Sequence, residues 1–578
     1  MRITLGSAAA ALALCLFAAA PAGAAGSADA QLKADINSFL GKLEASSQGL
    51  LKWQGADRMD VRDDGDGAVA DITGARISIG MDDKPDAKRA QISFDHLEIR
   101  RVPAPDGASK LSFVLPQAAL LTTPDHDEIK LTLNSATGSA VIDPKSGRAR
   151  ESQLAIASAR LDDKKTGDWV SFGPLSWSGK LTGSGNGGWT GPMDLELKKV
   201  EFFVAQGPAN GAIDRIAYTA RSSGPDLAAL NRLRDRLDAM REENLPPEKR
   251  LDAMLDLLPN LLSLFTDAKG EGTIEGLVVR PPKGDPFVSL KKASIGVALT
   301  GLSGDEAALR ITVGHDGLTV APALLAAGKV PHHAIVDIGL ENVGTGALRG
   351  ILQAASKMRA GAKAADKEQA QQQMIGAAAM LNPTFRIYNI AVDTPDVGIE
   401  ATGEAKGSPL SPKGYAAQAD IALRGIDALE AEAGALGPAP ALYLPLLKEI
   451  GTAAKGDDGT PRLKYHLTST MQQLLTVNGS DFKAWLVADD AGPGQPRILR
   501  PALPVMTGAD VSAVQHALAA AKIAVPQSGA YDGATAAAVF RFQKANALNA
   551  DGLVDMATRQ KLGVKPTAAE PPVKKRAN

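Results

Sequence analysis

The sequence of 578 residues contains a single cysteine, Cys15. This residue lies in an N-terminal segment that we expect to be removed, so the mature chain is predicted to have no thiol. Without a thiol, the mature chain can form no disulfide, no cysteine nucleophile and no thiolate metal site. Hydrolases and transpeptidases that use a catalytic cysteine are therefore excluded.

An excess of charge of either sign is also absent. The chain has 63 Lys and Arg against 65 Asp and Glu, a formal net charge of −2, whereas proteins that bind nucleic acid usually carry a strongly basic face. Aromatic residues make up only 4% of the chain, while glycine (58) and proline (35) are plentiful. This composition argues against a nucleic-acid partner and favours many short elements separated by turns.

Long apolar runs are missing beyond the first 25 residues. No later segment reaches the roughly 18 consecutive apolar residues of a membrane-spanning helix. The mature chain is therefore predicted to have no transmembrane segment. Since domains typically contain roughly 100 to 200 residues, the chain is long enough for three or four folded units.

The common catalytic and metal-binding motifs are absent as well. No histidine stands in a zinc pattern, and the densest group of ligand types, at 125–128, is predicted to be a solvated turn. Two Ser-x-x-Lys matches, at 289–292 and 480–483, follow the Lys-Thr-Gly at 165–167, an order opposite to that of penicillin-recognising enzymes. We predict no catalytic residue, metal or cofactor. A hydrolase with two carboxylates far apart in sequence stays open, because such a pair has no spacing rule.

The first 25 residues have the order of a secretory signal peptide. Arg2 precedes an apolar run at 5–20, which is followed by Pro21 and small residues at 22–25. We expect cleavage near Ala24, so that residues 1–24 are the signal and the protein is periplasmic or secreted in a bacterial cell envelope. The alternatives are a retained membrane helix and lipidation of Cys15, although Leu14 stands where lipoprotein signals have a small residue.

Residues 25–223 are predicted to form an N-terminal helix and an antiparallel β region. At 29–53 the apolar positions recur at spacings of three and four, which is the period of an amphipathic helix. Between 67 and 220 the apolar positions alternate, as in Ile92, Phe94, Leu97 and Ile99. Such alternation indicates half-buried strands joined by turns.

Residues 224–488 are predicted to repeat a unit of helices followed by a β-hairpin. A helical hairpin at 225–262 precedes strands through 299, and helices at 346–381 precede strands through 423. A shorter third copy would begin with a helix at 442–450. Independent alternation of helices and hairpins would give the same pattern, so it stands as an alternative to true repetition.

Two segments of open composition follow the body. Residues 489–505, rich in Pro and Gly, are predicted to be an interdomain linker. Residues 565–578 combine three prolines with a cluster of cations and are predicted to be a disordered basic tail. That tail is either a solvated terminus or a contact for anionic wall polymers.

Between these two segments, residues 506–564 are predicted to form a small module of three helices, at 510–521, 532–545 and 555–562. The second and third helices open with Asp532 and Asp555, each followed three residues later by a threonine. An aspartate at this position can accept hydrogen bonds from unpaired N–H groups of the first turn, and its charge suits the helix dipole.

The order and spacing of this stretch resemble the peptidoglycan-binding-like family of three-helix modules. The resemblance is carried by Gly508, Val511, Val514, Gln515, Leu518, Gly529, Tyr531, Asp532, Thr535, Val539, Phe542, Gln543, Leu548, Asp551, Gly552, Val554, Asp555, Thr558 and Leu562. Departures from the family are Asp532, Asp555, Val514 and Ala547. The resemblance implies a non-catalytic module that binds peptidoglycan and positions a neighbouring domain on the wall.

Within the module we predict that Val511, Leu518, Val539, Phe542 and Leu562 form the core. Gln515 and Gln543 have two possible roles, either binding muropeptide amides or satisfying backbone groups. Contact with peptidoglycan is expected at an exposed edge, where a ring, a hydroxyl and charges could meet sugar and peptide. The candidate residues for this contact are Tyr531, Thr535, Arg541 and Asp551.

The predicted fold class is α+β, with a large antiparallel β-rich body that contains repeated helix-hairpin units and a small all-α three-helix module at the C-terminus. The order of elements in the body resembles envelope proteins of the AsmA-like and lipid-transfer kinds. Three hypotheses follow: a peptidoglycan-binding protein whose body has an unknown ligand, a wall-tethered carrier of lipid or another hydrophobe, and a wall hydrolase with an unrecognised catalytic body.

Overall fold

The computed structural model describes residues 27–30, 32, 33, 36, 51–80, 89–122, 128–142, 149–180, 182–183, 189–205, 209–223, 236, 266–322, 330–358, 363–407, 415–456, 458–470, 475–486 and 496–565. The predicted signal peptide at 1–24, the helical hairpin at 225–262 apart from Arg236, and the tail beyond Lys565 lie outside these residues. The chain divides into two compact units, Met1–Val330 with Arg349–Met374, and Pro331–Leu348 with Ile375–Asn578.

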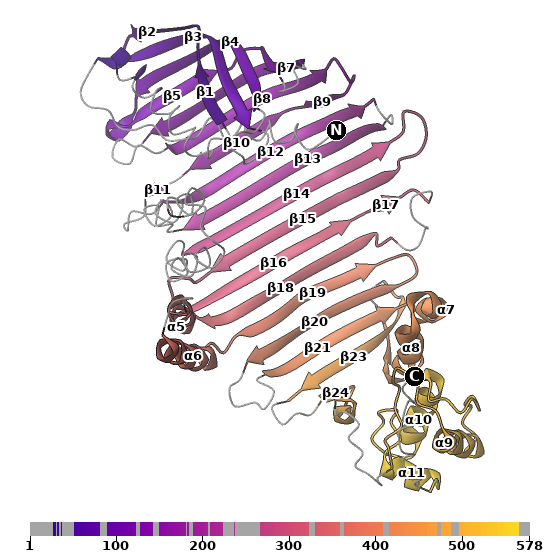
Figure 1. Ribbon diagram of the computed structural model, residues 1–578. Helices are drawn as coiled ribbons and strands as arrows, with labels where there is room; N and C mark the ends of the chain where they lie inside the picture. The colour runs from indigo at the N-terminus through magenta and orange to yellow at the C-terminus, as the bar shows by residue number, and fades with distance from the viewer. Residues whose placement is uncertain are drawn as a thin grey trace, which may run out of the picture. The chain divides into compact units, whose positions relative to one another are not determined.

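The first unit is built from antiparallel strands (Figure 1). They are β1 (Leu51–Gly55), β2 (Arg58–Asp64), β3 (Gly67–Gly80), β4 (Arg89–Pro103), β5 (Ser109–Val114), β6 (Ala118–Thr122), β7 (Glu128–Ile142), β8 (Ala149–Asp163), β9 (Trp169–Phe172), β10 (Leu175–Lys180), β11 (Thr182–Gly183), β12 (Trp189–Val204), β13 (Ala209–Ser223), β14 (Asp267–Arg280), β15 (Val288–Thr300), β16 (Glu306–Asp316) and β17 (Thr319–Val320).

The alternating residues of the N-terminal strands form one hydrophobic core. Ile72, Ile92 and Phe94 are buried there with alternate residues of β7 and β8. Leu32 and Ile36, four residues apart and both helical, are buried in the same core. Residues at this spacing share a helix face, so the described part of the predicted N-terminal helix packs as its apolar period indicates.

Strands β13 to β16 have one apolar and one polar face. The register aligns Tyr218, Gly272, Ile295 and Val313 across the four strands, and directly opposed residues point to the same face. Tyr218, Ile295 and Val313 are all exposed, Ile295 to 55%. The neighbouring row on the other face is polar or small: Thr219, Glu271, Gly296 and Thr312.

The second unit also contains an antiparallel sheet with helices (Figure 1). Its strands are β18 (His333–Gly344), β19 (Thr384–Asp393), β20 (Gly398–Gly407), β21 (Tyr415–Arg424), β22 (Thr452–Lys455), β23 (Pro461–Ser469), β24 (Leu475–Val477) and β25 (Ser480–Asp481). A helix pair, α5 (Thr345–Ser356) and α6 (Ala364–Ala379), connects β18 to β19 in the chain, and the division between the units falls within this pair.

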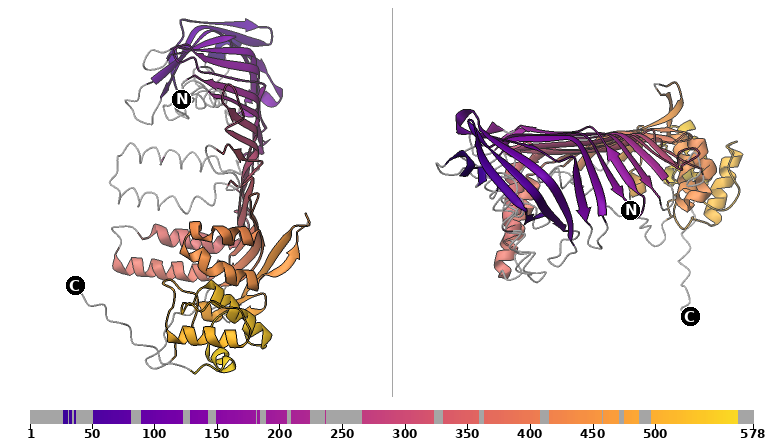
Figure 2. Two further views of the ribbon diagram at one scale, coloured as in Figure 1. Left: turned by 90° about the vertical axis from the view of Figure 1, so that its right-hand side faces the viewer. Right: turned by 90° about the horizontal axis from the view of Figure 1, so that it is seen from above.

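A second pair, α7 (Ile426–Leu436) and α8 (Pro438–Ile450), connects β21 to β22 and packs against β21 and β23. Ile426 and Leu446 of these helices form a core with Leu423 and Tyr465 of the strands. Figure 2 shows both helices on one side of the strands. The α+β class predicted from the sequence is confirmed, including strand hairpins preceded by helix pairs.

Candidate functional site

The C-terminal module consists of α9 (Ala509–Ala520), α10 (Gly533–Ala545) and α11 (Met556–Leu562). The side chain of Asp532 accepts a hydrogen bond of 2.8 Å from the N–H of Thr535, and Asp555 accepts one of 2.8 Å from Thr558. Both aspartates are therefore N-caps, as the sequence predicts. The departure from glycine at these two positions adds a helix cap.

The predicted core residues of the module lie inside it. Val511, Leu518, Val539 and Phe542 are buried, and Leu562 is partly buried against the same cluster. Their spacing brings three short helices around one apolar centre, which is how a small module buries its hydrophobic surface.

The two glutamines of the motif are structural. The buried amide of Gln543 donates to the carbonyl of Leu553 (2.8 Å) and to Asp551 (2.9 Å), and it accepts from the N–H groups of Gly552 (2.8 Å) and Asp551 (3.1 Å). Gln515 is buried in the same way and accepts from the N–H of Gly529 at 2.8 Å. Of the two roles open from the sequence, the structure shows the satisfaction of backbone groups.

Three of the four predicted contact residues are buried, which corrects the expectation of an exposed edge. The Tyr531 hydroxyl donates to the carbonyl of Gly552 at 2.8 Å, and burial raises the pKa of this hydroxyl well above its ordinary value. Thr535 is buried beside its cap. Asp551 is also buried and accepts from the N–H of Leu553 at 2.9 Å, and burial raises its pKa to about 6.

The fourth candidate, Arg541, has a side chain that is 40% exposed. Its guanidinium forms an ion pair of 2.5 Å with Glu449 of α8 and donates to the carbonyl of Ala524 at 3.1 Å. Arg541 is thus held in place by one contact to the body and one within the module.

The module is docked on α8. A Cβ atom at Gly533 would lie 2.3 Å from the carbonyl oxygen of Leu442, and one at Gly552 would lie 2.9 Å from Leu446. Asn549 exchanges two hydrogen bonds with the backbone of Asp481, at 2.8 and 2.7 Å. One hydrophobic cluster includes residues of the sheet, of α8 and of the module.

Helix α10 is consequently buried on both sides. Each residue of the consecutive run Ala536, Ala537, Ala538, Val539 and Phe540 is buried. One face packs on α9 and α11, and the other packs on α8. The sequence contained a signal for this docking, because no charged residue lies between Asp532 and Arg541 and a helix that is apolar all round is usually buried.

The segment before α9 packs against the module. Leu499 is fully buried and pairs with Val554. Arg497 binds both carboxylate oxygens of Asp510, at 2.8 and 2.9 Å. Although burial alone would raise the pKa of Asp510, the hydrogen bonds from Arg497 lower it. The predicted linker at 489–505 is described from residue 496 onward, and Leu499 in this part is buried.

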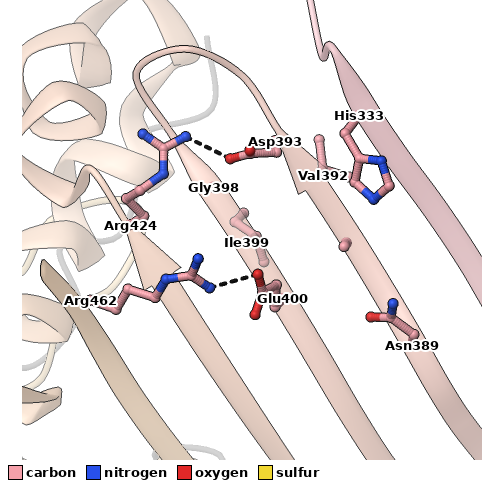
Figure 3. A pocket seen from close by; sticks show the side chains of 10 residues that line it. His333, Asn389, Val392, Asp393, Gly398, Ile399, Glu400, Arg424 and Arg462 are labelled. Carbon is pink, nitrogen blue, oxygen red and sulfur yellow. Dashed lines mark hydrogen bonds and ion pairs between the residues drawn. The ribbon is translucent and has the colours of Figure 1, made fainter. Parts of the chain in front are cut away.

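A polar hollow of about 320 Å³ lies on the other face of the second unit's sheet. The register aligns His333, Asp393, Gly398 and Arg424 across β18 to β21, and Arg462 stands beside this row on β23 (Figure 3). Further lining residues are Asn389, Ala391, Val392, Ile399 and Glu400. Because these residues come from five strands, no sequence motif marks the hollow.

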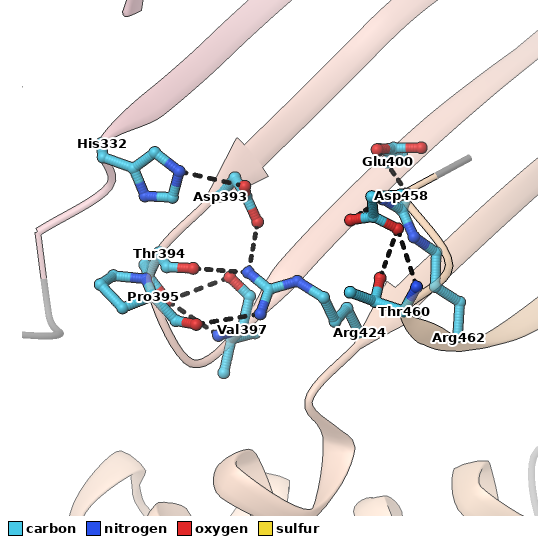
Figure 4. A network of polar contacts seen from close by, with 10 residues as sticks. All are labelled: His332, Asp393, Thr394, Pro395, Val397, Glu400, Arg424, Asp458, Thr460 and Arg462. Atoms are coloured by element: carbon cyan, nitrogen blue, oxygen red, sulfur yellow. Dashed lines mark hydrogen bonds and ion pairs between the residues drawn. The ribbon is translucent and has the colours of Figure 1, made fainter. Parts of the chain in front are cut away.

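Arg424 lines the hollow and forms hydrogen bonds to the β19–β20 turn. Its guanidinium donates to Asp393 (2.6 Å) and to the carbonyls of Thr394 (2.6 Å) and Pro395 (3.0 Å) (Figure 4). A Cβ atom at Gly398 would lie 2.5 Å from the Asp393 carboxylate. Glycine at this position therefore allows the ion pair to form across β20.

Arg462 is less fully bonded than Arg424. It pairs with Glu400 at 2.6 Å and with Asp458 at 3.5 Å, and its buried Nε has no hydrogen-bond partner among the described residues. The Glu400 side chain is 54% exposed, and one of its oxygens meets Arg462. The hollow thus combines two carboxylates with two guanidinium groups.

Among the described residues, His332 and the Ser289–Lys292 match do not form a reaction site. His332 pairs with Asp393 at 3.2 Å, and His126 lies outside the described residues. Ser289 and Lys292 lie in β15 at an odd spacing, which directs their side chains to opposite faces. Within the described ranges, no group of three or more His, Asp or Glu side chains could hold a metal ion.

Residues 507–562 match the model of the family described as putative peptidoglycan binding domain. The match covers the predicted module, and the matched family is one of binding domains. The body of the chain matches no family model. No curated protein and no solved structure matches the chain. Among the helices that the structure describes, none is both long enough and apolar enough to span a membrane.

Proposed function

We propose that this protein binds peptidoglycan through residues 507–562 and performs no chemistry on it with this module. The match of these residues to a peptidoglycan-binding family carries the proposal. The complete three-helix core, with both capping aspartates and both buried glutamines in place, supports it. Since peptidoglycan lies outside the cytoplasm, the proposal includes export through the N-terminal signal and a location in the cell envelope.

The docking of the module limits which of its surfaces can meet the wall. Helix α10 is covered by α8, and Tyr531, Thr535 and Asp551 are buried. Of the four residues selected from the sequence, Arg541 is the one with a substantially exposed side chain. A guanidinium has five N–H donors and can bind a carboxylate with two of them. We propose that Arg541 contacts a carboxylate of the peptide stems.

Pelleting of the full chain with purified sacculi tests this proposal. We expect the wild type to pellet with sacculi and not with cellulose. Arg541→Gln should weaken this binding by about 10-fold, the size expected for loss of a charge-assisted hydrogen bond. Point variants are preferable to deletion of the module, because deletion would expose the apolar residues of α8 that it covers.

Glu449→Gln is the matched control, since it removes the same ion pair from the side of the body. Unchanged binding by this variant would assign the effect of Arg541→Gln to the ligand. Equal weakening by both variants would instead assign it to the docking of the module. Pelleting of the wild type no better than with cellulose would refute peptidoglycan binding itself.

A second candidate function is the binding of lipid acyl chains by the apolar face of β13 to β16. This face exposes Tyr218, Ile295 and Val313 in one aligned row, with Val297 exposed in the next. A sheet normally buries its apolar face, and an exposed apolar patch usually marks an interaction site. Gly270 and Gly272 leave room for the Tyr218 side chain, since a Cβ atom at these positions would lie 3.2 and 3.8 Å from it.

Binding of a fluorescent fatty acid by the full chain tests this second function. Ile295→Asp places a charge within the apolar row and should weaken binding by at least 10-fold. Ser294→Asp is the control, because it adds the same charge to the opposite face of β15. The idea fails if the wild type does not bind the fatty acid, or if both variants weaken binding equally.

A further inference from the structure

The polar hollow described above is a cavity that peptidoglycan binding by the module does not use. It lies on β18 to β23, and the module is docked on α8 through other residues. We propose that this hollow binds a small zwitterion, either an amino acid or a short peptide with a free ammonium and a free carboxylate. The inference is independent of the binding of intact peptidoglycan.

The charge of the lining supports a ligand that carries both signs. Asp393 and Glu400 oppose Arg424 and Arg462, so the four groups sum to zero. An ion of a single charge would leave this arrangement unbalanced, whereas a zwitterion adds one partner for each sign. The guanidinium of Arg424 already donates to three acceptors, one of them Asp393. We therefore assign this ion pair to the lining of the hollow and not to the ligand.

Arg462 has hydrogen-bonding capacity left for a carboxylate. A guanidinium carries five N–H donors, and the acceptors that Arg462 meets among the described residues are Glu400, at 2.6 Å, and Asp458, at the longer distance of 3.5 Å. A ligand carboxylate at the terminal nitrogens would gain charge-assisted hydrogen bonds. Arg462 is therefore the group to which we assign the carboxylate.

The ammonium group can be received by Glu400 and Asn389. Glu400 uses Oε1 for Arg462, and its side chain is 54% exposed. Asn389 lines the same hollow from β19, where its backbone lies opposite Asp337 of β18. Figure 3 shows both side chains at the hollow. A carboxylate and an amide oxygen together provide acceptors for an ammonium group.

The size of the hollow agrees with a ligand of one or two residues. Ligand pockets in proteins begin at about 300 Å³, and this hollow measures about 320 Å³. A hollow at this lower limit has room for a small ligand such as a dipeptide. Longer peptides would have to extend beyond it.

Calorimetric titration of the full chain with alanyl-alanine and its capped forms tests the proposal. Alanyl-alanine is a zwitterion, its N-acetyl form is an anion and its amide is a cation. We expect the zwitterion to bind at least 10-fold more tightly than either capped form. Absence of binding at millimolar concentrations, or equal affinity for all three forms, would overturn the proposal.

Glu400→Gln should lower the affinity for alanyl-alanine by at least 10-fold. Glu404→Gln is the matched control, because Glu404 lies on the same strand, pairs with Arg386 at 3.3 Å and does not line the hollow. Asn389→Leu gives an independent second variant with the same expected loss. Thermal unfolding of each variant checks that the sheet is intact. Equal affinity of Glu400→Gln and Glu404→Gln would overturn the assignment.

The sacculus experiment and this titration can fail separately. Loss of pelleting in Arg541→Gln with unchanged binding of alanyl-alanine would confirm that the two sites are independent. If the chain does not pellet with sacculi but binds the dipeptide, the proposal of peptidoglycan binding is refuted and the proposal of a zwitterion site in the hollow is upheld.

Discussion

Replacement of Gln543 with leucine is expected to destabilise the C-terminal module by about 3–5 kcal/mol, which is a large effect for one substitution. The amide of Gln543 is bonded to the backbone of Asp551, Gly552 and Leu553 and to the side chain of Asp551. Leucine fills a similar volume but leaves these groups buried without partners. Each unsatisfied buried group costs roughly 1–3 kcal/mol.

Hydrogen exchange of the full chain followed by mass spectrometry measures this effect locally. We expect faster exchange throughout α9, α10 and α11 in the Gln543→Leu variant. Gln560→Leu is the control. Gln560 lies exposed on α11, so this substitution makes the same chemical change on the surface. Protection of the three helices that is unchanged in Gln543→Leu would contradict a structural role for this amide.

Substitution of Gly533 by alanine is expected to weaken the docking of the module on α8 by about 1–3 kcal/mol. The added Cβ atom would lie 2.3 Å from the carbonyl oxygen of Leu442 and 3.0 Å from the ring of Pro445. Since these are backbone and ring atoms, they cannot move aside as the end of a flexible side chain could. The two helices must therefore separate.

Hydrogen exchange again distinguishes the outcomes. In Gly533→Ala we expect increased exchange in α8, while exchange in α9 and α11 stays unchanged. Gly346→Ala is the matched control, because Gly346 also lies at the start of a helix and its added Cβ would meet no atom within 4 Å. There the better helix propensity of alanine should stabilise slightly. Equal exchange in the two variants would show that α10 and α8 are not in close contact.

The architecture was predictable wherever apolar residues repeat with a regular period. The alternation of Ile92 and Phe94 predicted a strand with one buried face, and both residues are buried in β4. The module was predictable from its motif, because the capping aspartates and core positions are adjacent or regularly spaced in sequence. Both glutamines bind backbone groups inside the module. This is one of the two roles that the sequence pattern allowed.

The contact surface could not be predicted in the same way. Tyr531, Thr535 and Asp551 carry polar groups that would suit an exposed edge, but each group is used within the module. The docking of α10 depends on a partner helix almost a hundred residues earlier in the chain. The polar hollow depends on the register of five strands, and a one-residue shift in register would turn its side chains to the other face.

The burial of α10 on two sides changes what a wall attachment would mean for the rest of the second unit. A module on an open linker would be a flexible tether, and the attached sheet could rotate freely relative to it. Here Gly533 and Gly552 sit directly against α8, and Arg541 is paired with Glu449. A glycan strand that holds the module would therefore also set the angle at which β18 to β23 face the wall, and tension on the strand would pass straight into α8.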